Sequence, residues 1–192
     1  RRVGLVHLAL TGVLEVVLLI QAAVARARTC GLDDELVRVA VRAADHVCDT
    51  FGPDGLTAIC GHPEIEPALV ELHRVTGNPR YLEQARLFVE RRGHGLLPDI
   101  EFGRSYYQDD LPVREAAALR GHAVRANYLA AGAVDVAVET GDTGLLDAVT
   151  RQWRHAVAAP PPGAGPRGWP WSPSAAWAGA SRRRTVARNS AE

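Results

Sequence analysis

The sequence predicts an all-α fold built of helical hairpins. Apolar side chains recur at helical spacing along most of the chain, and no segment alternates apolar and polar residues convincingly as a strand does. In addition, one turn pattern repeats: Gly31, Gly77 and Gly141 each precede a leucine by five residues and are followed closely by Asp or Asn. A glycine at a helix end readily adopts positive φ, and Asp or Asn begins the next helix. Each turn is therefore expected to join two helices.

The first three helices are placed from these turns and from the apolar pattern. The first, over 16–28, is a largely apolar segment that ends shortly before the first turn. The second, over 34–50, begins at the acidic residues of that turn. The third, over 63–76, begins at Pro63, because the fixed φ of proline suits the first helical turn, and it ends at the second glycine.

Three more helices follow in the second half of the chain. The fourth, over 79–92, carries a broad apolar stripe with a polar opposite face, which is typical of a helix that packs on a core. The fifth, over 112–139, begins at a proline and has possible break points at Gly121 and Gly132. The sixth, over 143–157, follows the third turn. The glycines of the three turns are unevenly spaced, which favours a barrel of paired helices over a solenoid of equal repeats.

Composition divides the chain into three parts. Residues 1–17 form an atypical apolar segment, for which a buried helix, a secretory signal and an out-of-frame sequence stay open. Glu15 interrupts this segment and argues against a membrane span. Residues 18–158 form the helical domain. Residues 159–192 hold six of the twelve prolines, three of the four tryptophans and one acid, so we expect a disordered or out-of-frame tail.

The charge balance and the cysteines exclude several classes of protein. The chain has 22 basic and 22 acidic residues, which excludes a generally basic nucleic-acid-binding protein. Its three cysteines, at 30, 48 and 60, cannot form a closed disulfide framework and lack the spacing of a zinc site. We therefore expect no metal ligands, no nucleic-acid or membrane partner, and a cytoplasmic protein, with secretion as the less favoured alternative. No phosphate-binding loop or nucleophile elbow is present.

The densest polar cluster is Cys60-Gly-His-Pro-Glu-Ile-Glu66. His62 lies near the expected start of a helix, where a neutral imidazole can donate or accept a hydrogen bond to a sugar hydroxyl. Glu64 lies in the first turn, where an acid suits the helix dipole. The alternative is that His62 only caps the helix and that the acids are surface charges.

A second cluster lies in the expected loop over 93–111 and just after it. Two tyrosines precede Gln108 and Asp109, and His122 follows among small residues. Flat aromatic faces for stacking, together with amide, acid and imidazole groups, are typical of a carbohydrate pocket. The alternative is an ordinary capped helix start with a core histidine, and this cluster alone leaves both open.

Taken in order, these motifs resemble one known family, the β-L-arabinofuranosidases of glycoside hydrolase family 127. The similarity covers about residues 18–157, and the segments that carry it are Gly61-His-Pro-Glu-Ile-Glu66, Thr76-Gly-Asn-Pro-Arg-Tyr-Leu82, Tyr107-Gln-Asp-Asp-Leu-Pro-Val-Arg-Glu115 and Gly121-His-Ala-Val-Arg-Ala126. The resemblance implies an (α/α)6 barrel, of which this chain supplies about half. It also implies that His62 and His122 line the sugar subsite. Glu64, Gln108 and Asp109 are further substrate-binding candidates on the chemistry of their own side chains.

The resemblance implies a specific chemistry for the intact family. That chemistry is retaining hydrolysis of a terminal β-L-arabinofuranosyl residue, by a cysteine thiolate on zinc and a glutamic acid. The catalytic acid, the zinc ligands and the nucleophile fall downstream of the matched region, so this chain is expected to hold no catalytic residue and no zinc. The expected partners are an L-arabinofuranosyl-containing glycan and the missing remainder of the barrel.

Two other functions fit the same helical sequence. One is a non-catalytic helical binding or scaffold module that uses the barrel remnant as a surface. The other is a different (α/α)-barrel sugar enzyme, such as an unsaturated uronyl hydrolase or a sugar epimerase, although the ordered motifs fit these less well. Release of L-arabinose is expected to be absent from the isolated chain.

Overall fold

The computed structural model describes residues 2–98 and 102–158, with side chains from residue 15 onward. The chain up to Ala156 forms one compact unit. A second unit, Val157–Glu192, is described only at its first two residues, so the tail predicted for 159–192 lies outside the described residues.

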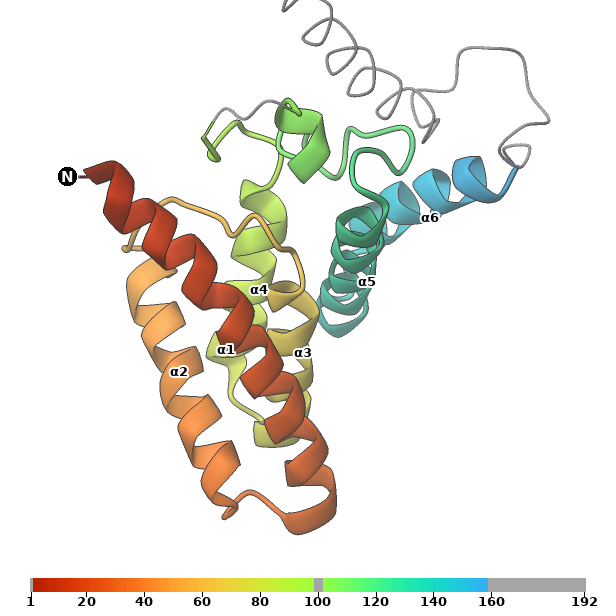
Figure 1. The fold of residues 1–192 in the computed structure, drawn as a ribbon. Helices are drawn as coiled ribbons and strands as arrows, with labels where there is room; N and C mark the ends of the chain where they lie inside the picture. The colour runs from red at the N-terminus through yellow and green to blue at the C-terminus, as the bar shows by residue number, and fades with distance from the viewer. Residues whose placement is uncertain (1, 99–101, 159–192) are drawn as a thin grey trace, which may run out of the picture. The chain divides into compact units, whose positions relative to one another are not determined.

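The described residues form an all-α fold without strands, as predicted (Figure 1). The elements in order are α1 (Arg2–Cys30), α2 (Glu35–Phe51), α3 (Ile65–Thr76), α4 (Pro79–Arg91), the short 3₁₀ helix η1 (Arg104–Tyr107), α5 (Ala123–Thr140) and α6 (Thr143–Ala158). Two helices differ in extent from the prediction at the N-terminal side. α1 begins at Arg2 and passes without a break through the boundary expected at residue 17, whereas α3 begins two residues after Pro63.

The three predicted turns are confirmed in detail. Gly31, Gly77 and Gly141 all have positive φ, between 70° and 88°. After the second of these turns, the Asn78 side chain accepts a hydrogen bond from the backbone N–H of Arg80, at 3.1 Å, and so caps α4. The other two turns carry equivalent aspartate caps at the starts of α2 and α6.

The single helix predicted over 112–139 is wrong in its first third. Residues 112–122 form turns, and α5 begins only at Ala123. Gly121, one of the two expected break points, has φ +73°, and a Cβ atom there would lie 1.9 Å from the Ser105 carbonyl oxygen. The chain is therefore folded back against η1 at this glycine, which a continuous helix would prevent.

The helices pack in two layers. α3 lies between α1 and α5, while α2 packs on α1, and α4 packs on α3 and α5 (Figure 1). The close approach of α5 to α3 depends on Gly132, where a Cβ atom would lie 2.8 Å from Glu66 Cβ and from Pro67 Cδ. This layering is that of part of an (α/α) barrel, in which every second helix belongs to the inner layer.

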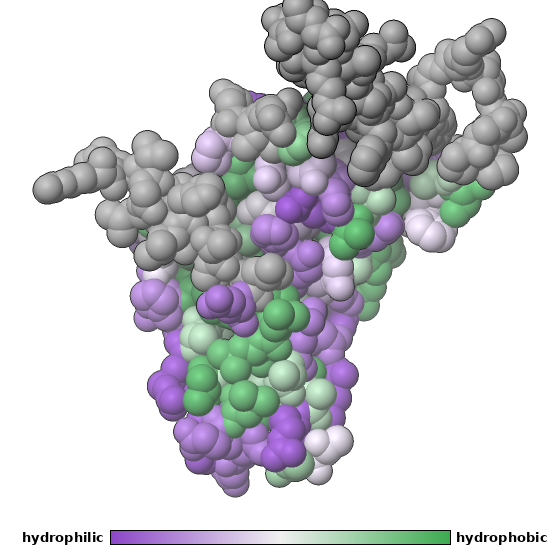
Figure 2. Space-filling view, in the orientation of Figure 1, coloured by the Kyte–Doolittle hydropathy of each residue, from purple (hydrophilic) through white to green (hydrophobic). Residues whose placement is uncertain are grey.

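α1 shows how one apolar helix serves the core on one side and remains exposed on the other. Val17, Ile20 and Val24 are buried at helical spacing, while Leu18 is 60% exposed. Figure 2 shows apolar side chains gathered over the face of α1 that this view presents, with polar side chains around them. Among the described residues, no helix combines the length and hydropathy needed to cross a membrane.

Candidate functional site

Two segments that are far apart in the sequence meet around the side chain of Arg125. His62 comes from the turn before α3, and His122 and Arg125 come from the start of α5. The Arg125 guanidinium lies 2.9 Å from His62 Nε2, and the backbone N–H of Arg125 is 3.5 Å from His122 Nδ1. We call His62, His122 and Arg125 the histidine–arginine cluster. The structure thus brings together the two histidines that the sequence singled out.

Aromatic rings of η1 form one wall of this cluster. The Arg125 guanidinium carbon lies 5.0 Å from the ring centroid of Tyr106 and 4.6 Å from that of Tyr107. The Tyr106 ring meets the His122 ring edge to face, with centroids 5.2 Å apart. A cation held over two aromatic rings is attracted by their π-electrons, so the guanidinium is fixed in place.

The Tyr107 ring packs closely against the turn that carries His62. A Cβ atom at Gly61 would lie 3.3 Å from Tyr107 Cε1. His62 itself is half-buried, and its backbone N–H points at Cys60 Sγ, 3.3 Å away. Burial lowers the pKa of His62, and the nearby positive charge of Arg125 lowers it further. The imidazole is thereby favoured in its neutral form.

Glu64 stands at the N-terminal end of α3, where its side chain makes no capping hydrogen bond. The side chain is buried, and its Oε2 atom has no hydrogen-bond partner among the described residues. A buried carboxylate oxygen without a donor is costly, which makes this atom an available acceptor for a ligand hydroxyl or a water molecule. The alternative interpretation of Glu64 as a surface charge is therefore wrong.

Gln108 and Asp109 are buried and serve the loop around the cluster. Gln108 has φ +55°, and its side-chain Nε2 donates to the carbonyl of Arg120, at 2.9 Å, which holds the two ends of the loop together. Asp109 accepts backbone N–H groups from the segment 93–97, the shortest at 2.7 Å from Leu97. Both carboxylate oxygens of Asp109 accept these bonds, so this residue stabilises the loop and offers no free oxygen to a ligand in this conformation.

A buried ion pair supports the same loop from the other side. Arg92 and Glu66 have fully buried side chains, with Arg92 Nη2 3.1 Å from Glu66 Oε1. The other terminal nitrogen of Arg92 donates to the Tyr107 carbonyl at 3.4 Å. Burial raises the pKa of Glu66, while the Arg92 charge opposes that rise. The pair thus links the start of α3, the end of α4 and η1.

The cysteines do not form a reactive or metal-binding group. Cys60 is buried, and this burial raises the pKa of its thiol to about 11. Cys48 is also buried, with its thiol pKa raised to about 11 by the same cause, and Cys30 is exposed at the far end of α1. Within residues 15–98 and 102–158, no three His, Cys, Asp or Glu side chains are grouped so that they would hold a metal ion.

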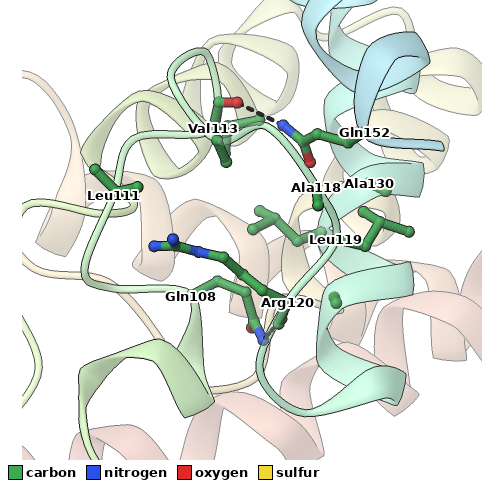
Figure 3. Close-up of a pocket in the computed structure, with 11 residues that line it drawn as sticks. Gln108, Leu111, Val113, Ala118, Leu119, Arg120, Ala130 and Gln152 are labelled. Atoms are coloured by element: carbon green, nitrogen blue, oxygen red, sulfur yellow. Dashed lines mark hydrogen bonds between the residues drawn. The ribbon is translucent and has the colours of Figure 1, made fainter. Parts of the chain in front are cut away.

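Two cavities lie outside the histidine–arginine cluster, and neither is lined by His62, His122 or Arg125. One, of about 20 Å³, lies between the 111–120 segment, α5 and α6, and is lined mainly by alanine and leucine with Gln108 and Gln152 (Figure 3). Gln152 is held there by a 2.6 Å hydrogen bond to the Val113 carbonyl. This cavity has room for about one water molecule and is too small for a sugar.

The other cavity, of about 200 Å³, lies between the end of α4 and the start of α6. Its charged walls include Glu90 and Arg114, which bond to each other. Arg114 is also bridged to Asp142 at 2.7 Å, so these charges are already used to join three elements. The charged side chains that line this cavity are therefore paired with one another.

Arg125 is the central residue that reasoning from the sequence missed. It was visible only as part of the motif Gly121-His122-Ala-Val-Arg125, yet it contacts both histidines and both tyrosines. The spacing was an available signal, because a residue three positions after a helix cap lies in the same first turn. The Glu66–Arg92 pair had no comparable signal, since its partners are 26 residues apart.

Comparisons with known proteins agree on one family. Residues 16–159 match the model of the β-L-arabinofuranosidase, GH127 catalytic domain. The non-reducing end β-L-arabinofuranosidase of Bifidobacterium longum subsp. longum is 34% identical over 156 residues, an alignment that covers 72% of this chain and 24% of that protein.

Solved structures show the same similarity. The GH127 β-L-arabinofuranosidase Ara127N of Geobacillus stearothermophilus T6 has a TM-score of 0.67 at 32% identity, over 72% of this chain and 24% of that one. A GH127 β-arabinofuranosidase has the same TM-score at 35% identity, over 74% of this chain and 22% of that one. The chain therefore spans about a quarter of the length of the relatives that it matches.

Proposed function

Because the chain belongs to the β-L-arabinofuranosidase family GH127, we propose that its histidine–arginine cluster is part of the subsite for a terminal β-L-arabinofuranosyl residue of a glycan. The observation that carries the proposal is the meeting of His62 and His122, from two different helix starts, on one arginine beside two tyrosines.

Each group has a task that its chemistry suits. The two imidazoles donate N–H groups to sugar oxygens, and the unpartnered oxygen of Glu64 accepts from a sugar hydroxyl. A tyrosine ring offers a flat apolar face to the C–H face of the sugar. Gln108 and Asp109 act indirectly, because their side chains hold the loop that carries the tyrosines.

Hydrolysis is proposed to require groups beyond the described residues. The zinc ion implied for the intact family would supply a metal-held thiolate, but the described residues do not fit it: no group of ligands is present, and Cys60 has a raised thiol pKa. We therefore assign no reaction step to zinc in this chain. The catalytic acid and nucleophile are proposed to belong to the part of the family that this chain does not cover, which implies that the chain binds without hydrolysing.

Calorimetric titration of the purified chain with methyl β-L-arabinofuranoside tests the proposal. We expect saturable binding that weakens about fivefold to tenfold in His62→Ala and in His122→Ala, because each change removes a hydrogen bond to the ligand. His155→Ala is the matched control, since His155 is exposed near the end of α6. Methyl β-D-glucopyranoside serves as the control ligand.

Three outcomes would contradict the proposal. The first is the absence of saturable binding. The second is binding that His62→Ala and His122→Ala leave unchanged, which would favour a scaffold module with another binding surface. The third is release of L-arabinose by the chain itself, abolished by zinc chelation, which would show that a complete catalytic site is present.

A further inference from the structure

The Arg125 side chain determines which nitrogen of His62 carries a proton. A guanidinium has only N–H donors and cannot accept a hydrogen bond. The Nη2 atom of Arg125 lies 2.9 Å from His62 Nε2, so this ring nitrogen must supply a lone pair. The proton of a neutral imidazole then sits on Nδ1.

The neighbouring charges act on the protonation of His62 in both directions. Arg125 and His122 at the start of α5 and Arg92 at the end of α4 oppose a positive charge on the ring, while Glu64 on the same turn favours one. Desolvation of the half-buried ring adds to the first group and is the largest single cause. The balance lowers the pKa of His62, which agrees with the hydrogen-bond geometry.

Arg125 also determines the tautomer of His122, which is the opposite of the tautomer of His62. Its Nδ1 is the acceptor, because the backbone N–H of Arg125 points at it from 3.5 Å, and the proton is left on Nε2. His122 therefore depends on the Arg125 backbone, whereas His62 depends on the Arg125 side chain. A substitution at position 125 therefore removes the hydrogen bond to His62 and keeps the one to His122.

We propose that Arg125 is a positioning residue that keeps His62 neutral and protonated on Nδ1, so that this nitrogen is the donor offered to a ligand oxygen. Stacking on Tyr106 and Tyr107 fixes the guanidinium in the orientation that this requires. The role of the donor rests on the proposed sugar subsite, but the protonation pattern of the two histidines does not.

Long-range ¹H–¹⁵N correlation spectra of the imidazole rings test this protonation pattern directly in the full chain. The ring nitrogen that lacks a proton resonates far from the protonated one, so each tautomer gives its own pattern. His62→Gln and His122→Gln each remove one set of signals and thereby assign the spectrum. We expect the Nδ1–H pattern for His62 and the Nε2–H pattern for His122 in the wild type at neutral pH.

Arg125→Met then removes the guanidinium while keeping an unbranched side chain. We expect the His62 signals to shift toward the Nε2–H pattern and the pKa of His62 to rise, while the His122 pattern stays as in the wild type and reports that α5 is intact. An Nε2–H pattern for His62 in the wild type would overturn the proposal, and this holds even if Arg125→Met does not fold. An unchanged His62 in folded Arg125→Met would overturn it equally.

Addition of methyl β-L-arabinofuranoside separates this inference from the proposed function. If the sugar subsite is correct, the His62 Nδ1–H signal shifts on saturation, and Arg125→Met binds about fivefold more weakly, as expected for one hydrogen bond. If the sugar moves neither histidine while the wild-type tautomers are as expected, the role of Arg125 stands and the proposed function fails.

Discussion

Removing Arg92 should cost far more stability than its single ion pair suggests. The Arg92 and Glu66 side chains are both fully buried, with 3.1 Å between their bonded atoms. Arg92→Met leaves the Glu66 carboxylate in the core without its cation, and breaking a buried pair in this way costs about 3–5 kcal/mol. The matched control is Arg38→Met, because Arg38 pairs with Glu35 at the surface, with both side chains more than half exposed. An exposed pair is worth about 0–1 kcal/mol.

The expected loss at Arg92 depends on pH. Burial already raises the pKa of Glu66, and loss of the opposing Arg92 charge raises it further. A carboxyl group whose folded pKa lies above its unfolded value stabilises the fold at low pH and loses that contribution as the pH rises. The deficit of Arg92→Met should therefore be greatest near neutral pH and shrink as Glu66 takes up a proton.

Urea unfolding followed by circular dichroism measures both effects, provided that the slope against urea stays constant among the variants. The double variant Glu66→Leu with Arg92→Met should recover most of the loss, because it leaves no uncompensated charge in the core. The reasoning is refuted if Arg92→Met costs no more than Arg38→Met. It is also refuted if the double variant is less stable than Arg92→Met alone.

Three further changes test the loop and the turns. Gly121→Ala should lower the free energy of unfolding by about 3 kcal/mol, because it places a side chain at positive φ and its Cβ atom overlaps the Ser105 carbonyl oxygen. The control Gly77→Ala should lower it by about 1 kcal/mol, because Gly77 has φ +72° and open space around its Cα. Asp109→Ala should lower the free energy of unfolding by about 2–4 kcal/mol, because it leaves buried backbone N–H groups unpaired. The control Asp110→Ala should lower it by less than about 1 kcal/mol, because the ion pair of Asp110 is partly exposed. Asp142, with its pKa lowered to about 2 by an arginine hydrogen bond, should lose its stabilising contribution as the pH falls from about 3.8 to about 2, and Asp142→Asn should show no such loss in acid denaturation.

The fold was predictable wherever its cause is local. Helix caps and positive-φ glycines depend on a few neighbouring residues, so the three hairpin turns could be found from the sequence. The start of α5 depends on a distant contact instead. Gly121 bends the chain back onto Ser105, and neither periodicity nor Pro112 reveals that the intervening residues leave the helical conformation.

The site was predictable as a set of residues but not as an arrangement. The sequence identified His62 and His122 and placed Gln108 and Asp109 beside aromatic residues, and the structure gathers all of them around the same loop. The sequence could not show that both carboxylate oxygens of Asp109 accept hydrogen bonds from backbone N–H groups, because these bonds depend on how the segment 93–97 folds back. Long-range partners of a buried polar group are set by packing, which sequence spacing does not encode.

The hairpin topology explains why these residues meet at all. In a chain of antiparallel helix pairs, every second helix points the same way, so the N-termini of α3 and α5 lie toward the same end of the fold, with the first turn of α3 beside the middle of α5 (Figure 1). His62 precedes the first of these helices and His122 precedes the second, and the close contact at Gly132 holds the two helices together. Motifs placed just before alternate helices are therefore brought to one end of the fold by its connectivity. Arg125, in the first turn of α5, then fixes the tautomers of His62 and His122, so that each imidazole offers one defined N–H donor.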